Sequence, residues 1–359
     1  MKTKHINKLL LFLLTAIIVF AVVRVVQIQT DDAAPKTAAR GSKTEEIKTE
    51  AGSSAAPQND TLTLSFVGDC MFASEHGTTE SGSFNRMAQQ QEPDYFLRNF
   101  IPLFRADDFT IANCECVLSD NELQEQPSTG GRSFRFKGSA RHAEIFRAAD
   151  VQFASLANNH THDYGQQGCD DTAAALETAG ILPGRQDVVT YAAVKGQKLG
   201  IFCTRMRADT GTQKVSAAIR EMQQADCSLI ILYFHSGIEY QTMPEQWLVR
   251  AFRALIDEGA DIIVSSHPHV LQPMEVYHGK PILYSLGNFC FGGNYHPPVD
   301  TVVYQAVYPL EDGQIGERRD VLIPCATFTG ERNNYQPAVV TDESKKQEIL
   351  NFLQTPVGS

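Results

Sequence analysis

Two histidines stand two residues apart in the segment His267-Pro268-His269. In an extended backbone, residues i and i+2 point to the same side of the chain, so both imidazoles can address one centre. Imidazole is a common ligand of zinc and iron, which makes a metal site one interpretation of this spacing. The alternative is a pair of loop histidines that make ordinary hydrogen bonds.

A second polar segment runs from Asn158 to Asp163, follows an apolar run and contains two histidines. Asn and Asp tolerate the left-handed backbone that such a loop needs, so turn formation with helix capping is one interpretation. The functional interpretation is an amide oxygen ligand, Asn159, beside a histidine that can donate a proton, His160. Two histidines in so short a loop favour the functional interpretation.

Two further groups place carboxylates near polar residues. In Asn113-Cys114-Glu115-Cys116, strand-like spacing puts Asn113 and Glu115 on one face and the cysteines on the other. This assigns the polar pair to a site and the cysteines to packing, with a Cys-x-Cys metal motif as the alternative. His235 is followed by Glu239, which can fix the tautomer of a metal-bound histidine or simply stand at a helix start, near the helix dipole.

Each of these groups, and Asp69 as well, follows a short apolar run that is typical of a β-strand. Patterns typical of helices stand between the runs, and this order predicts an α/β fold. The expected strands include 62–67, 109–112, 151–156, 229–234 and 262–264, with hairpins over 188–203 and 276–285. The expected helices include 140–149, 167–179, 212–224, 245–258 and 343–353. Ligands of open α/β sheets bind at the carboxyl ends of the strands, so these strand ends predict one convergent site.

The chemistry expected of such a site is metal-assisted. Imidazole and carboxylate together suit zinc, manganese or iron, so the predicted cofactor is a divalent ion of one of these metals. Two such ions about 3.5–4 Å apart can hold the attacking and the leaving oxygen of a phosphoryl transfer.

Six motifs of the sequence resemble, in the same order, those of the CapA family of poly-γ-glutamate capsule synthesis proteins. The resemblance extends from about Leu62 to about Phe291, and its last two motifs are long and specific. The motifs are Val67-Gly68-Asp69, Asn113-x-Glu115, Ala157-Asn158-Asn159-His160 with Asp163-Tyr164-Gly165, His235-Ser236-Gly237-x-Glu239-Tyr240, His267-Pro268-His269-Val270-x-Gln272-Pro273 and Gly279-Lys280-Pro281-Ile282-x-Tyr284-Ser285-Leu286-Gly287-Asn288-Phe289.

The CapA family in turn resembles the calcineurin-like metallophosphoesterases, which implies a four-layer α/β/β/α sandwich. The resemblance also implies that Glu115 bridges metals, that His160 is the general acid, and that Asp163 belongs to the catalytic group. The residues that it implies as metal ligands are Asp69, Glu115, Asn159, His235, His267 and His269. The chain departs from the metallophosphoesterases in having Asp69-Cys70-Met71 in place of Asp-x-His, and Asn113-x-Glu115 in place of Gly-Asp-x-x-Asp.

The N-terminus carries the clearest signal for location. Lysines precede an apolar segment, Leu9 to Ile28, that is long enough to span a bilayer as a helix. The lysines favour a cytoplasmic N-terminus, so we expect a single-pass anchor in the cell membrane with the rest of the chain outside the cytoplasm. A cleaved signal peptide is the alternative, although bulky residues stand where small ones are expected. The predicted organisation is an anchor over residues 1–28, a disordered tether over 29–60 and one CapA-like domain over 61–359.

Composition narrows the range of partners. The chain has 359 residues and a formal net charge of -11, and this acidic balance argues against nucleic acid as a partner. Its eight cysteines include no C-x-x-C pair, so a zinc ribbon or a thioredoxin motif is not indicated. Several cysteines stand in apolar runs, where buried packing is expected, with disulfide pairing as the alternative.

Three functions are compatible with these features. The first is a role in making or exporting poly-γ-glutamate capsule, together with a membrane-bound synthetase complex. The second is a metal-dependent phosphoesterase of the cell envelope, in which His160 protonates the leaving group. The third is an envelope polymer-binding domain without catalysis.

Overall fold

The computed structural model describes residues 61–75, 77–78, 80–127, 134–207, 211–293 and 296–358. The predicted membrane anchor and tether lie outside these residues. Within these ranges, no helix combines the length and the apolar character needed to cross a membrane.

The larger of two main sheets is built around strand β1 (Thr61–Met71), which carries the first predicted site residue. β1 runs parallel to β3 (Phe109–Cys114), and β3 runs parallel to β6 (Phe153–Ser155). On its other side, β1 pairs antiparallel with β15 (Asp300–Glu311) and then parallel with β14 (Asn288–Phe291). The other strands of this sheet are β7 (Leu182–Gly184), β16 (Gln314–Ile315), β17 (Arg319–Ala326) and β18 (Ala338–Val339).

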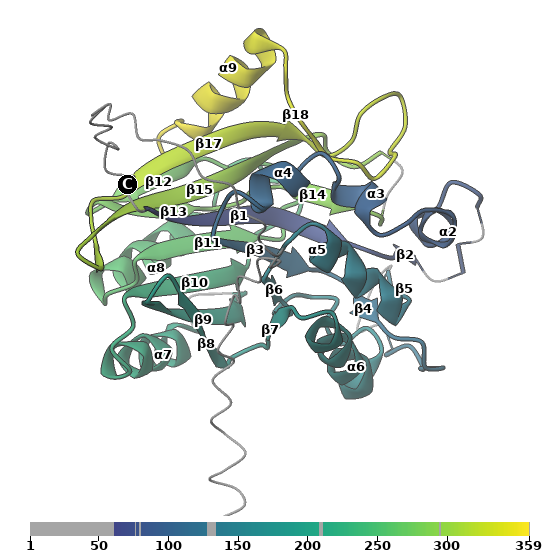
Figure 1. The fold of residues 1–359 in the computed structure, drawn as a ribbon, viewed down its shortest axis with the longest axis horizontal. Helices are drawn as coiled ribbons and strands as arrows, with labels where there is room; N and C mark the ends of the chain where they lie inside the picture. The colour runs from purple at the N-terminus through teal and green to yellow at the C-terminus, as the bar shows by residue number, and fades with distance from the viewer. Residues whose placement is uncertain are drawn as a thin grey trace, which may run out of the picture. The chain divides into compact units, whose positions relative to one another are not determined.

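The second sheet faces the first (Figure 1) and is mostly parallel. Apolar side chains alternate along its central strand, so that Ile230 and Leu232 face outward while Ile231 and Tyr233 face the first sheet. Its strands are β8 (Val189–Val194), β9 (Gln197–Arg205), β10 (Leu229–His235), β11 (Ile262–Ser266), β12 (Met274–Tyr277) and β13 (Lys280–Leu283). A third, small sheet contains β2 (Ser74–Glu75), β4 (Val117–Leu118) and β5 (Phe136–Gly138).

Helices cover the outer faces of both main sheets (Figure 1). On the second sheet, α7 (Thr212–Gln224) and α8 (Gln246–Asp257) bury apolar residues at helical spacing, such as Leu248 and Phe252. The first sheet is covered by α2 (Phe84–Gln90), α3 (Asp94–Leu97), α4 (Ile101–Phe104), η1 (Ala140–Ala143), α5 (Glu144–Ala148) and α6 (Gly165–Thr178).

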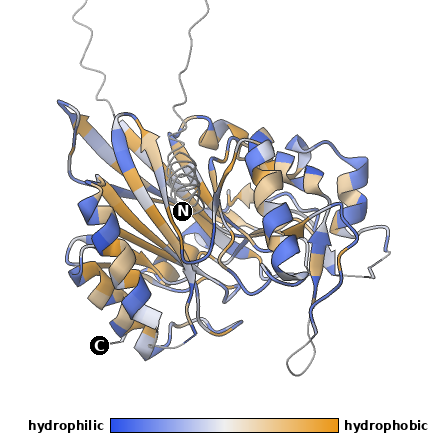
Figure 2. Cartoon of the chain, turned by 90° about the horizontal axis from the view of Figure 1, so that it is seen from below, coloured by the Kyte–Doolittle hydropathy of each residue, from blue (hydrophilic) through white to orange (hydrophobic). Residues whose placement is uncertain are grey.

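A separate apolar layer fills the space between the two sheets, so the layers run helix, sheet, sheet, helix. Figure 2 shows hydrophobic residues concentrated in the strands, while the helices carry both hydrophobic and hydrophilic residues. Two residues of the last helix, α9 (Glu343–Leu353), join the layer between the sheets. Burial on both faces explains why the strands are apolar almost throughout.

The α/β class predicted from the sequence is confirmed, and α7 and α9 coincide with the predicted helices 212–224 and 343–353. The sequence did not predict α2, α3 and α4, because helices of four to seven residues are too short to show a clear apolar period. The predicted strand 109–112 extends to Cys114, so Asn113 lies inside β3 instead of after it.

Candidate metal centre

The predicted site residues meet where the carboxyl ends of the two sheets face each other. Asp69 pairs with Asn113 across β1 and β3, and His235 pairs with Ser266 across β10 and β11. The segments after β3, β6 and β11 supply the other residues. The structure brings together all eight residues that the sequence singled out, while their roles as ligands or catalysts stay predictions.

The position of Asp69 depends on the glycine before it. A Cβ on Gly68 would lie 1.9 Å from the carbonyl oxygen of Gly287, so only glycine fits this close approach. The backbone N–H of Asp69 donates a hydrogen bond to the same carbonyl at 3.0 Å. This contact holds the end of β1 against the turn before β14 and fixes where the Asp69 carboxylate points.

Asp69 is fully buried, and its carboxylate makes polar contacts with three neighbouring residues. Its Oδ1 accepts a hydrogen bond from Asn113 Nδ2 at 2.7 Å, and its Oδ2 accepts one from the backbone N–H of His267 at 3.3 Å. Oδ2 also lies 3.3 Å from Nδ1 of His269. Burial alone raises the pKa of Asp69, but the hydrogen bond and the charge of His269 outweigh it and hold the pKa below its ordinary value.

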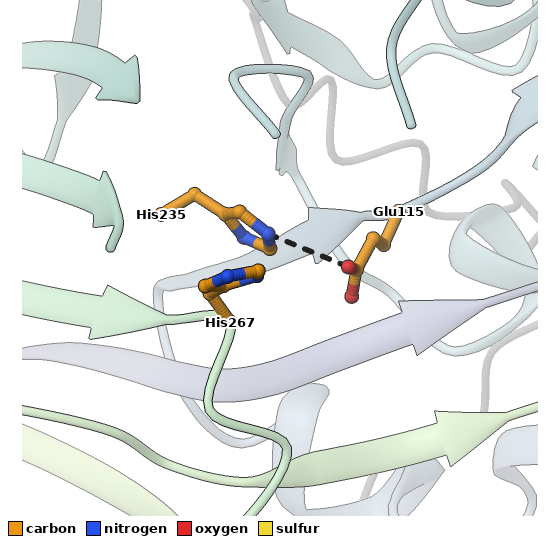
Figure 3. Close-up of side chains that lie close together, drawn as sticks. All are labelled: Glu115, His235 and His267. Atoms are coloured by element: carbon orange, nitrogen blue, oxygen red, sulfur yellow. Dashed lines mark ion pairs between the residues drawn. The ribbon is translucent and has the colours of Figure 1, made fainter. Parts of the chain in front are cut away.

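Glu115 is fully buried, and neither of its oxygens receives a hydrogen bond from a described residue. Its Oε1 lies 3.4 Å from Nε2 of His235 and 3.8 Å from Nε2 of His269. Figure 3 shows the carboxylate pointing at the ring of His235, with the ring of His267 beside it. Burial and the charge of Asp69 raise the pKa of Glu115 well above its ordinary value. A buried carboxyl group without donors is costly, and an ion would remove that cost.

The backbone of His267-Pro268-His269 is not extended, so the geometric reason given for this pair in the sequence was wrong. His267 has a φ of 105° and His269 one of 59°, both in the left-handed region. This turn, instead of strand alternation, places the two ring centroids 6.1 Å apart. Such backbone costs about 1–3 kcal/mol per residue and is imposed by the surrounding structure. Burial and the charge of His269 lower the pKa of His267 to about 4.

His235 ends β10 and presents its Nε2 to Glu115 and to Asn159, whose Oδ1 lies 2.5 Å away. Its Nδ1 lies 3.4 Å from Nδ2 of Asn113 and 3.4 Å from Oγ of Ser266. Because an amide nitrogen only donates, Nδ1 accepts in this arrangement and the ring proton lies on Nε2, which would have to lose it before binding a metal. Burial, followed by the neighbouring histidines, lowers the pKa of His235 well below its ordinary value, which favours the neutral form that binds metals.

Within this cluster, sets of three ligand atoms lie within 4.8 Å of one another. Two of the sets share Glu115, so one carboxylate could serve two neighbouring ions. The buried atoms without partners, Glu115 Oε1 and Oε2 and His267 Nδ1, are carboxylate and imidazole atoms that suit zinc, manganese or iron. The residues therefore fit a divalent metal, and the sets are Glu115, His235 and His267; Asp69, Glu115 and His269; and Glu239, His267 and His269.

His160 and Asp163 form a pair beside this cluster. Nδ1 of His160 lies 2.9 Å from Oδ2 of Asp163, which also accepts a hydrogen bond from the backbone N–H of Phe136 at 2.9 Å. The rings of Phe136 and His160 pack edge to face at a centroid distance of 4.8 Å. A carboxylate at Nδ1 orients the ring and favours a proton on that nitrogen, which leaves Nε2 for a substrate.

A cavity of about 330 Å³ opens beside these two groups. Both His160 and His269 line it, so the predicted proton donor, His160, and one predicted metal ligand, His269, face the same cavity. Its other walls are aromatic, hydroxyl and acidic, and include Ser74, Glu75, Phe136, Glu239, Tyr240 and Phe291. This arrangement is suited to hydrolysis of a bound substrate.

Two asparagines that the sequence did not single out hold the cluster in place. Asn158 Nδ2 donates to Oδ1 of Asn113 at 3.1 Å, and Asn158 Oδ1 accepts from the backbone N–H of His160 at 3.0 Å. Asn288 Oδ1 lies 3.0 Å from Nδ1 of His269. Both stand within the motifs quoted from the sequence, so the signal was present, but only the fold shows which atoms they hold.

Met71 stands where the resemblance would place a histidine ligand. It is buried in the apolar layer beneath the outer helices and takes no part in the cluster. Cys114 and Cys116 pack in the same layer, as predicted from their strand-like spacing. All eight cysteines lie in the described residues and all are free, so the disulfide alternative was wrong.

Two curated relatives cover most of the chain. It is 27% identical over 314 residues to the PGA biosynthesis protein CapA of Bacillus subtilis, and this alignment covers 81% of this chain and 77% of the relative. It is 28% identical over 281 residues to the capsule biosynthesis protein CapA of Bacillus anthracis, and this alignment covers 71% of this chain and 65% of the relative. Among solved structures, a phosphatase from Mycoplasma pneumoniae aligns with a TM-score of 0.44 at 14% identity, over 74% of this chain and 95% of that one.

A family model described as bacterial capsule synthesis protein PGA_cap matches residues 63–184 and 185–293. These two segments contain the cluster around Glu115, the His160–Asp163 pair and the His267-Pro268-His269 turn. Since they make up more than half of its length, the chain belongs to the bacterial capsule synthesis protein family PGA_cap.

Proposed function

We propose that this protein acts in the synthesis or export of poly-γ-glutamate capsule, as a membrane-anchored protein whose folded domain lies outside the cytoplasm. Family membership and the names of the two Bacillus relatives support the capsule role. The lysines and the apolar segment at the N-terminus support the anchor. The expected partners are the polymer itself and a membrane-bound synthetase complex.

The proposal includes a divalent-metal centre of manganese, iron or zinc in a domain of the metallophosphoesterase type. The observation that carries it is the buried Glu115 carboxylate, which has no donor among the described residues and lies between two histidines. Asp69, Glu115, Asn159, His235, His267 and His269 would hold the metal. When bound, a divalent metal supplies a Lewis acid and an activated water.

The residues of the chain have separate tasks in this proposal. Asp69 orients the ring of His269 and the turn at His267 through its Oδ2, while its Oδ1 holds the side chain of Asn113. Asp163 holds Nδ1–H of His160; from the doubly protonated ring, Nε2–H would pass its proton to the leaving group in the cavity and leave a neutral ring with the remaining proton on Nδ1.

The capsule role is tested in the organism that carries the gene. Deletion is expected to abolish or strongly reduce poly-γ-glutamate, both on the cells and in the medium. Complementation with the wild-type gene should restore the polymer, and complementation with the Glu115→Gln variant should not. Unchanged polymer after deletion would contradict the capsule role, and full restoration by Glu115→Gln would assign the domain a non-catalytic, polymer-binding role.

A second candidate, a phosphoesterase acting on a cell-envelope substrate, is favoured by the His160–Asp163 pair, which is built as a general acid with its orienting carboxylate. It predicts hydrolysis of bis(p-nitrophenyl) phosphate by the manganese-loaded protein. His160→Ala and Asp69→Ala should each lower the rate by about 100-fold or more. If both variants keep the wild-type rate, the mechanism is wrong.

A further inference from the structure

Arg205 is the last residue of β9 and pairs with His235 in the neighbouring strand β10. The two strands are parallel, and residues at one register of adjacent strands lie about 4.8 Å apart with side chains on the same face. His235 turns its ring toward Glu115, at 3.4 Å. The side chain of Arg205 therefore leaves the sheet on the side of the candidate metal centre.

No described residue makes a hydrogen bond or an ion pair with the Arg205 guanidinium, although the side chain is half-buried. Other arginines of the domain are paired, for example Arg253 with Glu275 at 2.7 Å. Arg207 follows two residues later and adds a second positive charge to this end of β9. Burial and the charge of Arg207 lower the pKa of Arg205 to about 10, and together they outweigh the opposing charge of Glu115.

The cavity beside the candidate metal centre carries the opposite charge. The cavity beside His160 and His269 is lined by two carboxylates, those of Glu75 and Glu239, and no lysine or arginine of the described ranges lines it. An anionic group placed there would meet these carboxylates. Arg205, at the end of β9 and in register with His235, is the cation, unpaired among the described residues, that such a group could meet.

We propose that Arg205 binds an oxyanion of the substrate, a phosphoryl or carboxylate group, next to the metal centre and so selects anionic substrates. The guanidinium can offer two parallel N–H···O bonds to such a group. The rest of the substrate would then lie in the cavity lined by His160 and His269. This inference rests on the proposed metal centre and adds the chemical class of its ligand.

The test is calorimetric titration of the full-length, manganese-loaded protein with inorganic phosphate and, separately, with glutarate, at about 0.15 M salt. Arg205→Met should weaken binding of the preferred anion by about tenfold or more, since a charge-assisted hydrogen bond is lost. Arg205→Lys keeps the charge but loses the pair of parallel N–H donors, so its anion affinity should lie between those of the wild type and Arg205→Met. The anion that loses more affinity identifies the group as phosphoryl or carboxylate.

Arg207→Met is the matched control, because it removes the same charge from an exposed side chain. It should change anion affinity by less than about twofold at this salt concentration. Manganese content and Tm of Arg205→Met should equal those of the wild type, which separates lost binding from misfolding.

Equal anion affinities of the wild type and Arg205→Met overturn the proposal, and so does an equal loss in Arg207→Met. If the wild type holds manganese but binds neither anion, the Arg205 proposal fails and the metal centre stands. If the wild type holds no manganese, both fail together.

Discussion

Replacing Glu115 by glutamine should stabilise the metal-free protein and remove most of the stabilisation that manganese gives to the wild type. In the metal-free protein, burial raises the pKa of Glu115 well above its ordinary value, so folding becomes costlier as the pH rises above that ordinary value. The glutamine keeps the shape and removes the ionisation. At pH 8 we expect Glu115→Gln to stabilise the metal-free protein by about 1–3 kcal/mol.

For a domain of this size, about 1 kcal/mol corresponds to about 2 °C in Tm, so the metal-free gain is about 2–6 °C. Manganese at about 100 times its Kd should stabilise the wild type by about 2.7 kcal/mol, or roughly 5 °C. The variant, which lacks the shared carboxylate, should show little or no shift with manganese. The assay is thermal unfolding of the full-length protein, followed by circular dichroism in EDTA and in excess manganese.

Asp107→Asn is the control for the loss of a second carboxyl group, on a half-buried residue. Burial raises the pKa of Asp107 to about 7, and its Oδ1 has no partner among the described residues. Asp107 precedes β3, whereas Glu115 follows it, so the two lie at opposite ends of the strand. The control should gain stability without metal and keep the full manganese shift. A destabilised metal-free Glu115→Gln, or one with the wild-type manganese shift, would refute the reasoning.

Three further predictions follow from the same geometry. Gly68→Ala should unfold the domain or leave it insoluble, because the new Cβ meets the Gly287 carbonyl at 1.9 Å; a cooperative Tm within about 2 °C of the wild type would contradict this. Asp163→Asn should slow phosphodiester hydrolysis about 10–100-fold with unchanged manganese content, since His160 loses its orienting carboxylate; an unchanged rate and pH profile would contradict it. Manganese affinity should fall by up to about tenfold per pH unit as the pH decreases through the raised pKa of Glu115, because Glu115 must lose its proton to bind the metal. Calorimetric titration with manganese at several pH values checks this. An affinity that does not change with pH would exclude Glu115 as a ligand.

Much of the site could be predicted from the sequence because strand ends are visible in it. Apolar runs mark the strands, and parallel strands bring their carboxyl ends to one edge, so Asp69, Glu115 and His235 were expected to converge. The role of Arg205 could not be predicted in this way. Its importance depends on the register between β9 and β10, which the pattern of β9 does not contain.

Two further features of the site could not be predicted from the sequence, namely the conformation at His267 and the close approach of Gly68 to Gly287. A positive φ at a histidine is imposed by tertiary contacts, here including the hydrogen bond from the His267 amide to Asp69. Likewise, no local signal reveals that β14 returns from far along the chain to lie beside β1. These features arise from long-range packing, whereas sequence patterns report mainly local structure.

The central claim, that the cluster around Glu115 is a metal centre, is tested most directly by elemental analysis of the purified protein. The wild type, loaded with manganese and desalted, should hold one or two equivalents of manganese, iron or zinc. His267→Ala should lose most of that metal while keeping a cooperative unfolding transition. A wild type without bound metal, or a His267→Ala variant with the full amount, would contradict the account.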